Sequence, residues 1–323
     1  MERRKVIIDC DPGIDDALAL MLAIKSEELE ILGITVCSGN VPAKMGAKNA
    51  IKVLEICERT DIPVYIGEEL PLVRELVTAQ DTHGEDGLGE NNYSDVEGVE
   101  PKEGGVQFIV NTLKNKENVS IIALAPLTNI AKALQVDKEA FANIDEFVTM
   151  GGNFKSNGNC SPVAEFNYWV DPHAADYVYK NMPVKVQMIG LDVTREIVLT
   201  PNRLELMSRL GNEKMYKFIK EITRFYIDFH WNQEGIIGCV INDPLAIAYF
   251  IDKSICSGKE YFVEVEEAGK AIGMTIVDEF DFYKKEKNAL VLTEVDSEKT
   301  MKMFMNRIFP GNEELIEAMG GNL

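Results

Sequence analysis

Residues 5–16 have the sequence Lys5-Val6-Ile7-Ile8-Asp9-Cys10-Asp11-Pro12-Gly13-Ile14-Asp15-Asp16. The run 5–10 is short and mainly apolar, and apolar side chains then recur at helical spacing over residues 15–25. A strand that is apolar on both faces and leads into a helix is typical of a parallel sheet covered by helices on both sides. The segment therefore predicts an α/β protein.

The same alternation of apolar runs and helical patterns continues over the first two-thirds of the chain. Further strands are predicted at residues 31–36, 63–66, 119–124, 146–150 and 184–189, and helices at 43–58, 104–113, 128–134 and 172–181. From about residue 258 the pattern changes to antiparallel-type strands at 261–265, 271–277 and 289–293, followed by a helix over 297–309. No Pro-, Gly- or Ser-rich linker divides the chain. We therefore predict one domain over residues 1–323, with a Rossmann-like, open, mostly parallel sheet, helices on both faces and appended C-terminal antiparallel strands.

Polar clusters follow several of these predicted strands. They comprise residues 9–16, 38–40, 126–129 and 151–153, and Asp192. In open α/β sheets, ligands bind outside the carboxyl ends of the strands. We therefore expect a ligand site at this edge of the sheet.

The composition argues against several classes of partner. A formal net charge of −20 is unsuited to a nucleic-acid backbone or to an anionic membrane surface, because both attract basic proteins. No apolar run approaches the roughly 18 residues of a membrane span, and the basic start of the chain leads directly into a strand rather than a signal-peptide core. The six cysteines are scattered without metal-binding spacing, which favours buried free thiols and a cytoplasmic location.

Asp9, Asp11, Asp15 and Asp16 form an acidic cluster directly after the first predicted strand. These carboxylates would repel one another unless a cation or protons neutralised them, and oxygen ligands suit Ca²⁺ or Mg²⁺. Part of the cluster could instead cap the next helix. An EF-hand is excluded because a strand precedes the cluster and Leu20 stands where the loop needs its twelfth-position glutamate. A phosphatase of the haloacid dehalogenase type, with Asp9 as the phosphoryl acceptor, stays open on this motif alone.

Further motifs occur in order along the chain. They are Asp81-Thr82-His83-Gly84-Glu85-Asp86-Gly87-Leu88-Gly89, Ala125-Pro126-Leu127-Thr128-Asn129, Met150-Gly151-Gly152-Asn153, Glu165-Phe166-Asn167-Tyr168-Trp169-Val170-Asp171-Pro172 and Asn242-Asp243-Pro244-Leu245-Ala246. Together with the Asp-x-Asp-x-Gly-x-Asp-Asp pattern that begins at Asp9, they resemble the inosine-uridine-preferring nucleoside hydrolase family over almost the whole chain. The resemblance implies hydrolysis of the N-glycosidic bond of ribonucleosides to free base and ribose, and it argues against the phosphatase.

A calcium site is also implied by this resemblance. Ca²⁺ would be bound by Asp11, Asp16, Asp243 and the backbone carbonyl of Leu124, with water and two substrate hydroxyls completing the oxygen shell. Asp11 is implied as the base that activates the attacking water, whose pKa the metal would lower.

Contacts to the substrate follow from the same resemblance. The implied substrate-binding residues are Asp15, Asn40, Met150, Asn159, Glu165, Asn167, Tyr226 and Glu234. Asp15 and Asn40 are expected at the ribose 2′-hydroxyl, and Asn159, Glu165 and Asn167 at the 3′ and 5′ hydroxyls. Acceptors such as Asp15 and Glu165 also suit a sugar that develops positive charge in the transition state.

The sequence departs from the family at the leaving group. Many members have a histidine that protonates the departing base, whereas this chain has Asn242, which can donate a hydrogen bond but no proton at neutral pH. His83, expected close to the nucleobase, could supply the proton instead. A nucleoside-binding protein with weak or no hydrolysis, and a hydrolase of nucleosides whose base departs easily, both stay open. The family is usually dimeric or tetrameric, so the resemblance also implies a homo-oligomer.

A helix predicted over residues 214–232 offers a second candidate for the missing acid. If this helix continues to Glu234, then Tyr226, His230 and Glu234 lie on one of its faces. We predict that His230, polarised by Glu234 or Tyr226, assists the leaving base. Trp231 is a further candidate for contact with the base.

Overall fold

The computed structural model describes residues 3–320. A ten-stranded sheet crosses the molecule in the order β11-β10-β12-β7-β6-β5-β1-β2-β3-β4, and a small second sheet joins β8 to β9. The strands are β1 (Arg4–Cys10), β2 (Leu29–Val36), β3 (Val64–Ile66), β4 (Lys102–Glu103), β5 (Val119–Ala123), β6 (Ile144–Met150), β7 (Val186–Ile189), β8 (Val198–Leu199), β9 (Cys239–Val240), β10 (Cys256–Val265), β11 (Thr275–Asp278) and β12 (Ala289–Val295).

The large sheet is parallel except at its C-terminal end. β1 pairs in parallel with β2 and β5, and parallel pairing continues through β3 and β4 on one side and through β6, β7 and β12 on the other. β10 pairs antiparallel with both β12 and β11. The predicted sheet architecture is therefore confirmed. β11 begins later than the predicted 271–277 because Gly269–Ala271 forms a 3₁₀ turn and Gly273 has a φ of 81°.

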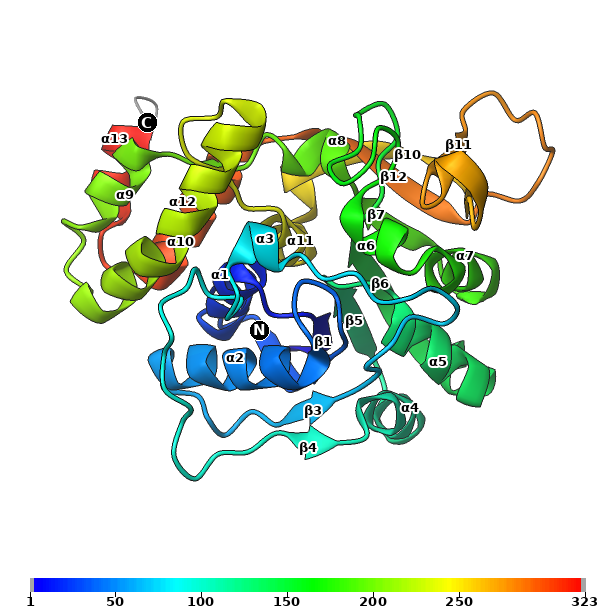
Figure 1. The fold of residues 1–323 in the computed structure, drawn as a ribbon, viewed down its shortest axis with the longest axis horizontal. Coiled ribbons are helices and arrows are strands. Elements are labelled where there is room, and N and C mark those ends of the chain that lie inside the picture. The colour runs from blue at the N-terminus through cyan, green and yellow to red at the C-terminus, as the bar shows by residue number, and fades with distance from the viewer. Residues whose placement is uncertain (1–2, 321–323) are drawn as a thin grey trace.

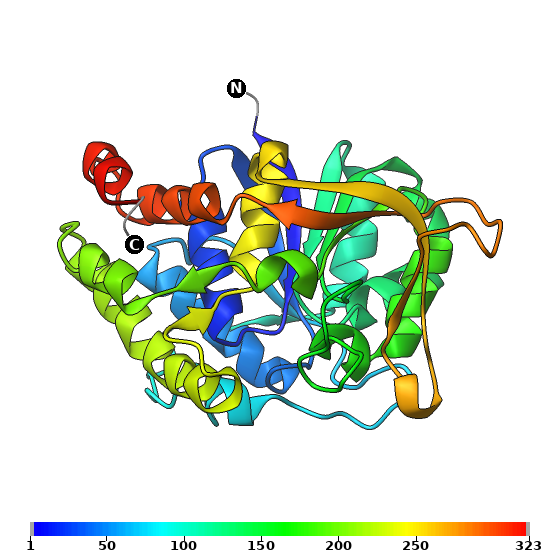
Figure 2. The same ribbon diagram turned by 90° about the horizontal axis from the view of Figure 1, so that it is seen from above.

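Helices cover both faces of the sheet. They are α1 (Ile14–Ile24), α2 (Ala43–Ile56), α3 (Gln80–His83), α4 (Gly105–Asn115), α5 (Thr128–Val136), α6 (Phe166–Val170), α7 (Pro172–Asn181), α8 (Leu191–Thr194), α9 (Pro201–Met207), α10 (Glu213–Glu234), α11 (Asp243–Ile251), α12 (Ser297–Ile308) and α13 (Glu313–Gly320). α4, α5 and α7 pack together on one face, and α1, α2, α11 and α12 on the other (Figures 1 and 2). Within residues 3–320, none of these helices has the length and apolarity needed to cross a membrane.

The apolar character of β1 on both faces follows from this arrangement. Val6 and Ile8 contribute to the core beneath α1 and α11, whereas Ile7 contributes to the core beneath α4 and α5, and all of them are fully buried. Each such side chain stabilises the fold by about 1.5–3 kcal/mol. At the carboxyl end of β1, the Asp9 Oδ1 atom accepts hydrogen bonds from Thr35 Oγ1 (2.5 Å) and Asn129 Nδ2 (2.8 Å). Asp9 thereby ties β1 to β2 and to the start of α5.

The helix α10 continues to Glu234, as the common face of Tyr226, His230 and Glu234 requires. Asn212 caps its N-terminus by accepting a hydrogen bond from a backbone N–H, and Gly235 ends it with a φ of 69°.

All six cysteines are free, and five of them are buried. Cys160 is exposed, so the prediction of buried thiols is wrong at this position. The reason is its location in the polar loop that precedes α6, away from both cores.

Candidate active site

A cavity of about 470 Å³ opens at the carboxyl edge of the large sheet. Its lining takes one residue at or after the end of each of β1, β2, β5, β6 and β7: Asp15, Asn40, Leu124, Met150 and Leu191. The polar clusters that follow the central strands therefore meet around one cavity, as the topology of open α/β sheets predicts.

Most of the residues expected at the site line this cavity. They are Asp15, Asn40, His83, Leu124, Met150, Asn159, Glu165, Asn167, Tyr226, His230, Glu234, Asn242 and Asp243. Asp11 and Asp16 lie outside the lining, but Asn40 connects both to it. The Asn40 backbone N–H donates to Asp11 Oδ2 (2.5 Å), and its side-chain Nδ2 donates to Asp16 Oδ2 (2.9 Å).

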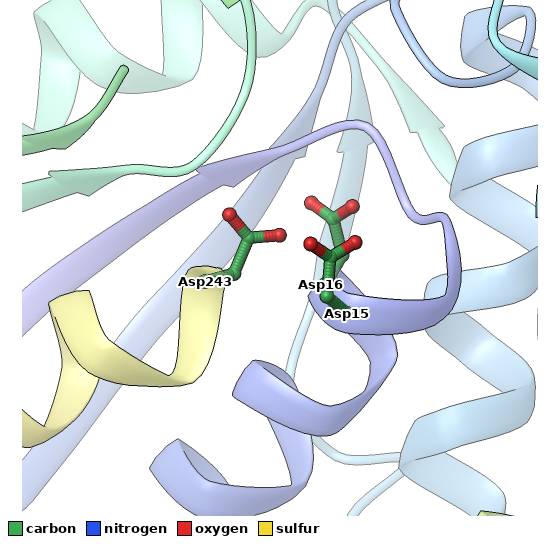
Figure 3. A group of neighbouring side chains, drawn as sticks. All are labelled: Asp15, Asp16 and Asp243. Carbon is green, nitrogen blue, oxygen red and sulfur yellow. The ribbon is translucent and has the colours of Figure 1, made fainter. Parts of the chain in front are cut away.

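Three carboxylates from two helix N-termini converge beside the cavity (Figure 3). Asp15 and Asp16 belong to the first turn of α1, and Asp243 is the first residue of α11; one oxygen of each lies within 4.8 Å of the others. Asp16 also caps its own helix, because its Oδ2 accepts the backbone N–H of Gly13 (3.1 Å) and its Oδ1 that of Asp11 (3.2 Å). Helix capping therefore explains part of the acidic segment, but it does not involve Asp243.

The electrostatics of this cluster are unfavourable without a counterion. Burial raises the pKa of Asp16 to about 7, with a further contribution from the Asp15 carboxylate. Burial also raises the pKa of Asp11 and of Asp243 well above the ordinary range, and the neighbouring aspartates add to both shifts. Among residues 3–320, the one basic side chain within ion-pair distance of these four is His83, whose Nδ1 lies 4.0 Å from Asp15 Oδ1.

The residues present fit a hard metal ion. Asp11 Oδ1 and Asp15 Oδ1 are buried and have no hydrogen-bond partner within the described part of the chain, so both lone-pair sets are available to a cation or a ligand. All the donors are oxygens, which is the ligand type that Ca²⁺ and Mg²⁺ prefer. Asp15, expected at the ribose, forms a group with Asp16 and Asp243 whose oxygens lie within 4.8 Å of one another, and Asp11 is not part of this group. This acidic cluster could bind a metal ion.

The close approach of Asp11 depends on a glycine. A Cβ atom at Gly39 would lie 2.0 Å from Asp11 Oδ2, so any side chain at position 39 would displace the carboxylate. Gly39 belongs to the polar turn that follows β2 and precedes Asn40. The position of the Asp11 carboxylate therefore depends on a glycine in the turn after β2.

The wall formed by α6 is held by backbone hydrogen bonds. The Glu165 carboxylate accepts the backbone N–H groups of Gly152 and Asn167, both at 2.8 Å, and burial raises its pKa to about 7. The Asn167 Nδ2 atom donates to the carbonyl oxygens of Leu124 (2.8 Å) and Met150 (3.2 Å). These bonds fix Glu165 and Asn167 before any substrate binds.

Asn159 lies in an exposed loop at the mouth of the cavity. Its Oδ1 accepts the backbone N–H of Phe166 (2.9 Å), which leaves its amide NH₂ group for another partner. Asp192, which also follows β7, does not line the cavity. Its carboxylate accepts the backbone N–H groups of residues 154–156 and thereby supports the loop that carries Asn159.

Asn242 donates hydrogen bonds to the Asp15 carboxylate. Its side-chain Nδ2 and its backbone N–H both donate to Asp15 Oδ2, at 3.0 and 3.3 Å, and the Tyr226 hydroxyl donates to the same oxygen at 3.3 Å. These three donors fix the Asp15 carboxylate and leave Oδ1 free. Asn242 is therefore a positioning residue for Asp15.

His83 and His230 line the cavity from α3 and α10, and both rings lie close to the Tyr226 ring. His83 Nδ1 accepts the backbone N–H of Ile14 (3.1 Å). His230 Nδ1 lies 2.9 Å from the Tyr226 carbonyl oxygen, so the expected polarising partner is Tyr226, through its backbone rather than its hydroxyl. Burial lowers the pKa of both imidazoles.

Several lining residues have no counterpart among the sequence predictions. Phe229 and Gln233 on α10 line the cavity, whereas Trp231 is 57% exposed and does not. Helical periodicity could have identified Phe229 and Gln233, because they lie three and seven residues after Tyr226. Arg195 also lines the cavity and donates to the Gly158 carbonyl (3.0 Å), but no sequence motif surrounds it.

Comparisons with known proteins agree with this geometry. The sequence model for the inosine-uridine preferring nucleoside hydrolase family matches residues 6–302. A pyrimidine-specific ribonucleoside hydrolase of Salmonella gallinarum is 35% identical over 94% of this chain and 97% of its own length. A probable uridine nucleosidase of Arabidopsis thaliana is 33% identical over 95% of this chain and 98% of its own length.

Solved structures give the same result. A plant nucleoside hydrolase superposes with a TM-score of 0.89 at 29% identity, over 95% of this chain and 99% of that one. A purine-preferring ribonucleoside hydrolase from Gardnerella vaginalis superposes with a TM-score of 0.88 at 31% identity, over 97% of this chain and 99% of that one. The chain therefore belongs to the inosine-uridine preferring nucleoside hydrolase family, and it is a nucleoside hydrolase.

Proposed function

We propose that this protein is a calcium-dependent enzyme that hydrolyses the N-glycosidic bond of ribonucleosides to free base and ribose. The observation that carries the proposal is the buried acidic cluster with two unpartnered oxygens, Asp11 Oδ1 and Asp15 Oδ1, next to a cavity that also exposes two histidines. Carboxylates and imidazoles that line one cavity suit a substrate that carries both sugar hydroxyls and a heterocyclic base.

Asp11, Asp16, Asp243 and the Leu124 carbonyl would hold the calcium ion. Ca²⁺ accepts carboxylate and carbonyl oxygens in flexible geometry, and it is preferred over Mg²⁺ because the donors come from several separate elements. When bound, the ion would supply Lewis-acid stabilisation of an attacking water and a grip on the ribose hydroxyls. The neutralising charge would also allow the four carboxylates of the cluster to ionise together.

Asp11 is proposed as the base that takes a proton from the attacking water. Its Oδ2 is held by the Asn40 backbone N–H, so that Oδ1, which has no partner among the described residues, is the oxygen left to accept this proton. A positioned carboxylate is better than a mobile one because its orientation is fixed before the reaction begins.

The sugar is proposed to lie along Asp15 and the α6 wall. Asp15 Oδ1 can accept a ribose hydroxyl while Oδ2 stays bonded to Asn242 and Tyr226. The amide NH₂ of Asn159 and the Glu165 carboxylate would contact the remaining hydroxyls, with Asn40, Met150 and Asn167 completing the sugar side of the cavity. Negative charge around the ring stabilises the oxocarbenium-like transition state.

Between the two histidines proposed to assist the leaving base, the geometry favours His83. Its Nδ1 accepts a backbone N–H, so its proton resides on Nε2, from which the neutral ring can donate a hydrogen bond to the leaving base. Asn242 does not replace the missing acid, because its amide is engaged with Asp15. The limited acid function on this side also favours a second candidate, hydrolysis of nucleosides whose base departs easily.

Product analysis tests the proposal. Uridine and inosine are incubated with the enzyme and with calcium, and free base and ribose are separated by chromatography. We expect equimolar uracil or hypoxanthine and ribose from at least one substrate. Tight binding of a nucleoside without release of base would instead identify a nucleoside-binding protein.

A further inference from the structure

The tautomer of His230 can be assigned from its surroundings. A backbone carbonyl only accepts hydrogen bonds, so the 2.9 Å contact between His230 Nδ1 and the Tyr226 oxygen places the proton on Nδ1. A neutral imidazole carries one N–H, and burial of His230 opposes the binding of a second proton. The Nε2 atom is therefore a bare acceptor.

This acceptor faces the cavity. His230 lines the cavity, and its Nε2 makes no hydrogen bond within residues 3–320. This nitrogen is not fully enclosed by protein atoms, so a ligand can reach it. The ring is held edge to face by Tyr226, with centroids 4.4 Å apart, and by Phe229 at 5.4 Å. The ring cannot turn without losing the Nδ1 hydrogen bond, so its acceptor is fixed in direction.

His83 has the opposite polarity. The backbone N–H of Ile14 occupies its Nδ1, which places the proton on Nε2, and a Cβ atom at Gly13 would lie only 2.7 Å from that Nδ1. The cavity therefore has one fixed imidazole donor and one fixed imidazole acceptor, and both rings lie near the Tyr226 ring, at centroid distances of 5.1 and 4.4 Å. A planar heterocycle that carries both an acceptor and an N–H donor matches this pair.

We propose that His230 is a specificity-determining residue, which accepts a hydrogen bond from an N–H of the nucleobase at Nε2. The enzyme then takes ribonucleosides whose base presents such a donor and discriminates against those whose base lacks it. This inference rests on the proposed function of the site and assigns His230 a recognition role in place of proton donation.

Substrate pairs that differ in one N–H donor group, an amino group or a ring N–H, test this assignment. The pairs are cytidine and pyrimidin-2-one riboside, adenosine and purine riboside, and uridine and 3-methyluridine; the first two delete the donor without adding bulk. kcat/KM is measured for each member with the wild type and with His230→Phe, which keeps the ring and removes the acceptor. We expect the wild type to favour the N–H member of at least one pair by about tenfold, and His230→Phe to bring that pair within about twofold.

Two variants serve as controls. His230→Gln retains an acceptor oxygen at a similar reach and is expected to keep the preference that His230→Phe loses. Trp231→Phe changes the neighbouring residue, which lies outside the cavity lining, and is expected to match the wild type in every pair. Thermal denaturation establishes that each variant is folded.

The possible outcomes separate the two proposals. A preference that is equal in the wild type and in folded His230→Phe, or the absence of any preference in the wild type, overturns the assignment of His230 and leaves the hydrolase intact. If the calcium-loaded wild type releases no base from any substrate, the proposed function fails and the assignment fails with it.

Discussion

The carboxylates of Asp9, Asp11, Asp15 and Asp16 differ in their hydrogen-bond partners and in which of their oxygens remain without one. Asp9 and Asp16 hold neighbouring elements: the first through Thr35 and Asn129, the second through backbone N–H groups at the start of α1. Asp9, Asp11 and Asp15 each have one oxygen fixed by protein donors and the other without a partner among the described residues, and of these three Asp15 lines the cavity and Asp11 is bonded to Asn40, which lines it. A carboxylate of this kind is suited to contact a ligand, because its orientation is already fixed.

Substitution of Asp11 tests its role as the base. Asp11→Asn keeps an oxygen for the Asn40 N–H but removes the proton acceptor, so kcat should fall by about 10²–10⁴-fold. The melting temperature should not fall, because the substitution removes a buried negative charge from the cluster. Steady-state release of base and differential scanning fluorimetry measure both quantities. A kcat within a few-fold of the wild type would exclude Asp11 as the base.

Asn242→Ala tests whether Asn242 acts through Asp15. Loss of the side-chain donor to Asp15 Oδ2 should weaken the contact with the ribose 2′-hydroxyl, and kcat/KM for ribonucleosides should fall about tenfold. The 2′-deoxynucleosides lack this hydroxyl, so their kcat/KM should change much less. An equal loss for ribo- and 2′-deoxynucleosides would show that Asn242 acts on the base instead.

For individual residues, the sequence predicted which of them lie at the cavity. It did not predict which hydrogen bonds each of them makes there. The motif order placed Asn242 and Asp15 at one site, helical spacing added His230, and all of them line the cavity. The hydrogen bond between Asn242 and Asp15 depends on the distance between α1 and the turn before α11, and the contact of His230 with the Tyr226 carbonyl, within α10, depends on the orientation of the imidazole. The hydrogen bond from the Asn242 amide to Asp15 and the contact of His230 with the Tyr226 carbonyl therefore could not be predicted from the sequence.

At the scale of elements, length decided which predictions were possible. The strands at the centre of the large sheet and the helices α2, α4, α5, α7, α10 and α12 are long enough to show periodicity, and they were predicted. β4, β8 and β9 have two residues each, and α3, α6 and α8 have four or five, so no period is visible in them. α11 is buried along nearly its whole length, with no polar face to identify it as an amphipathic helix.

The buried carboxyl groups around the cavity predict an unusual dependence of the free energy of unfolding on pH. Burial raises the pKa of Asp9, Asp16 and Glu165 to about 7, whereas the unfolded carboxyls titrate near 4. Between these values the folded, metal-free protein binds more protons than the unfolded chain, so its free energy of unfolding falls as the pH rises. Bound calcium would counteract this loss by stabilising the ionised form of the carboxylates that hold it.

Thermal denaturation at pH 5 and pH 8, with calcium and with a chelator, measures this effect. We expect calcium to raise the melting temperature by several degrees more at pH 8 than at pH 5, because protons compete with the ion at the lower pH. The comparison at each pH cancels the contribution of the overall negative charge. An equal calcium shift at both pH values, or none at either, would contradict the assignment of Asp11, Asp16 and Asp243 to the metal.

At the scale of the whole molecule, the sheet is a scaffold that brings distant segments to one edge. Asp15 and Asp243 are separated by most of the chain, yet the order β6-β5-β1-β2 and the pairing of α1 with α11 place them within 4.8 Å. The sequence predicted this edge because the strand-end rule applies to any open α/β sheet. A single chain does not show how copies associate, so the homo-oligomer stays a prediction. Sedimentation velocity should give the mass of a dimer or tetramer.

The dependence of nucleoside hydrolysis on calcium tests the central claim most directly. The purified enzyme is stripped with a chelator and assayed with uridine, cytidine, inosine and adenosine, and with a phosphomonoester, before and after calcium is restored. Hydrolysis of at least one nucleoside should fall by about 100-fold or more on stripping and return with Ca²⁺, with no phosphate released from the phosphomonoester. Undiminished release of base by the stripped enzyme would contradict the account, and so would release of phosphate in its place.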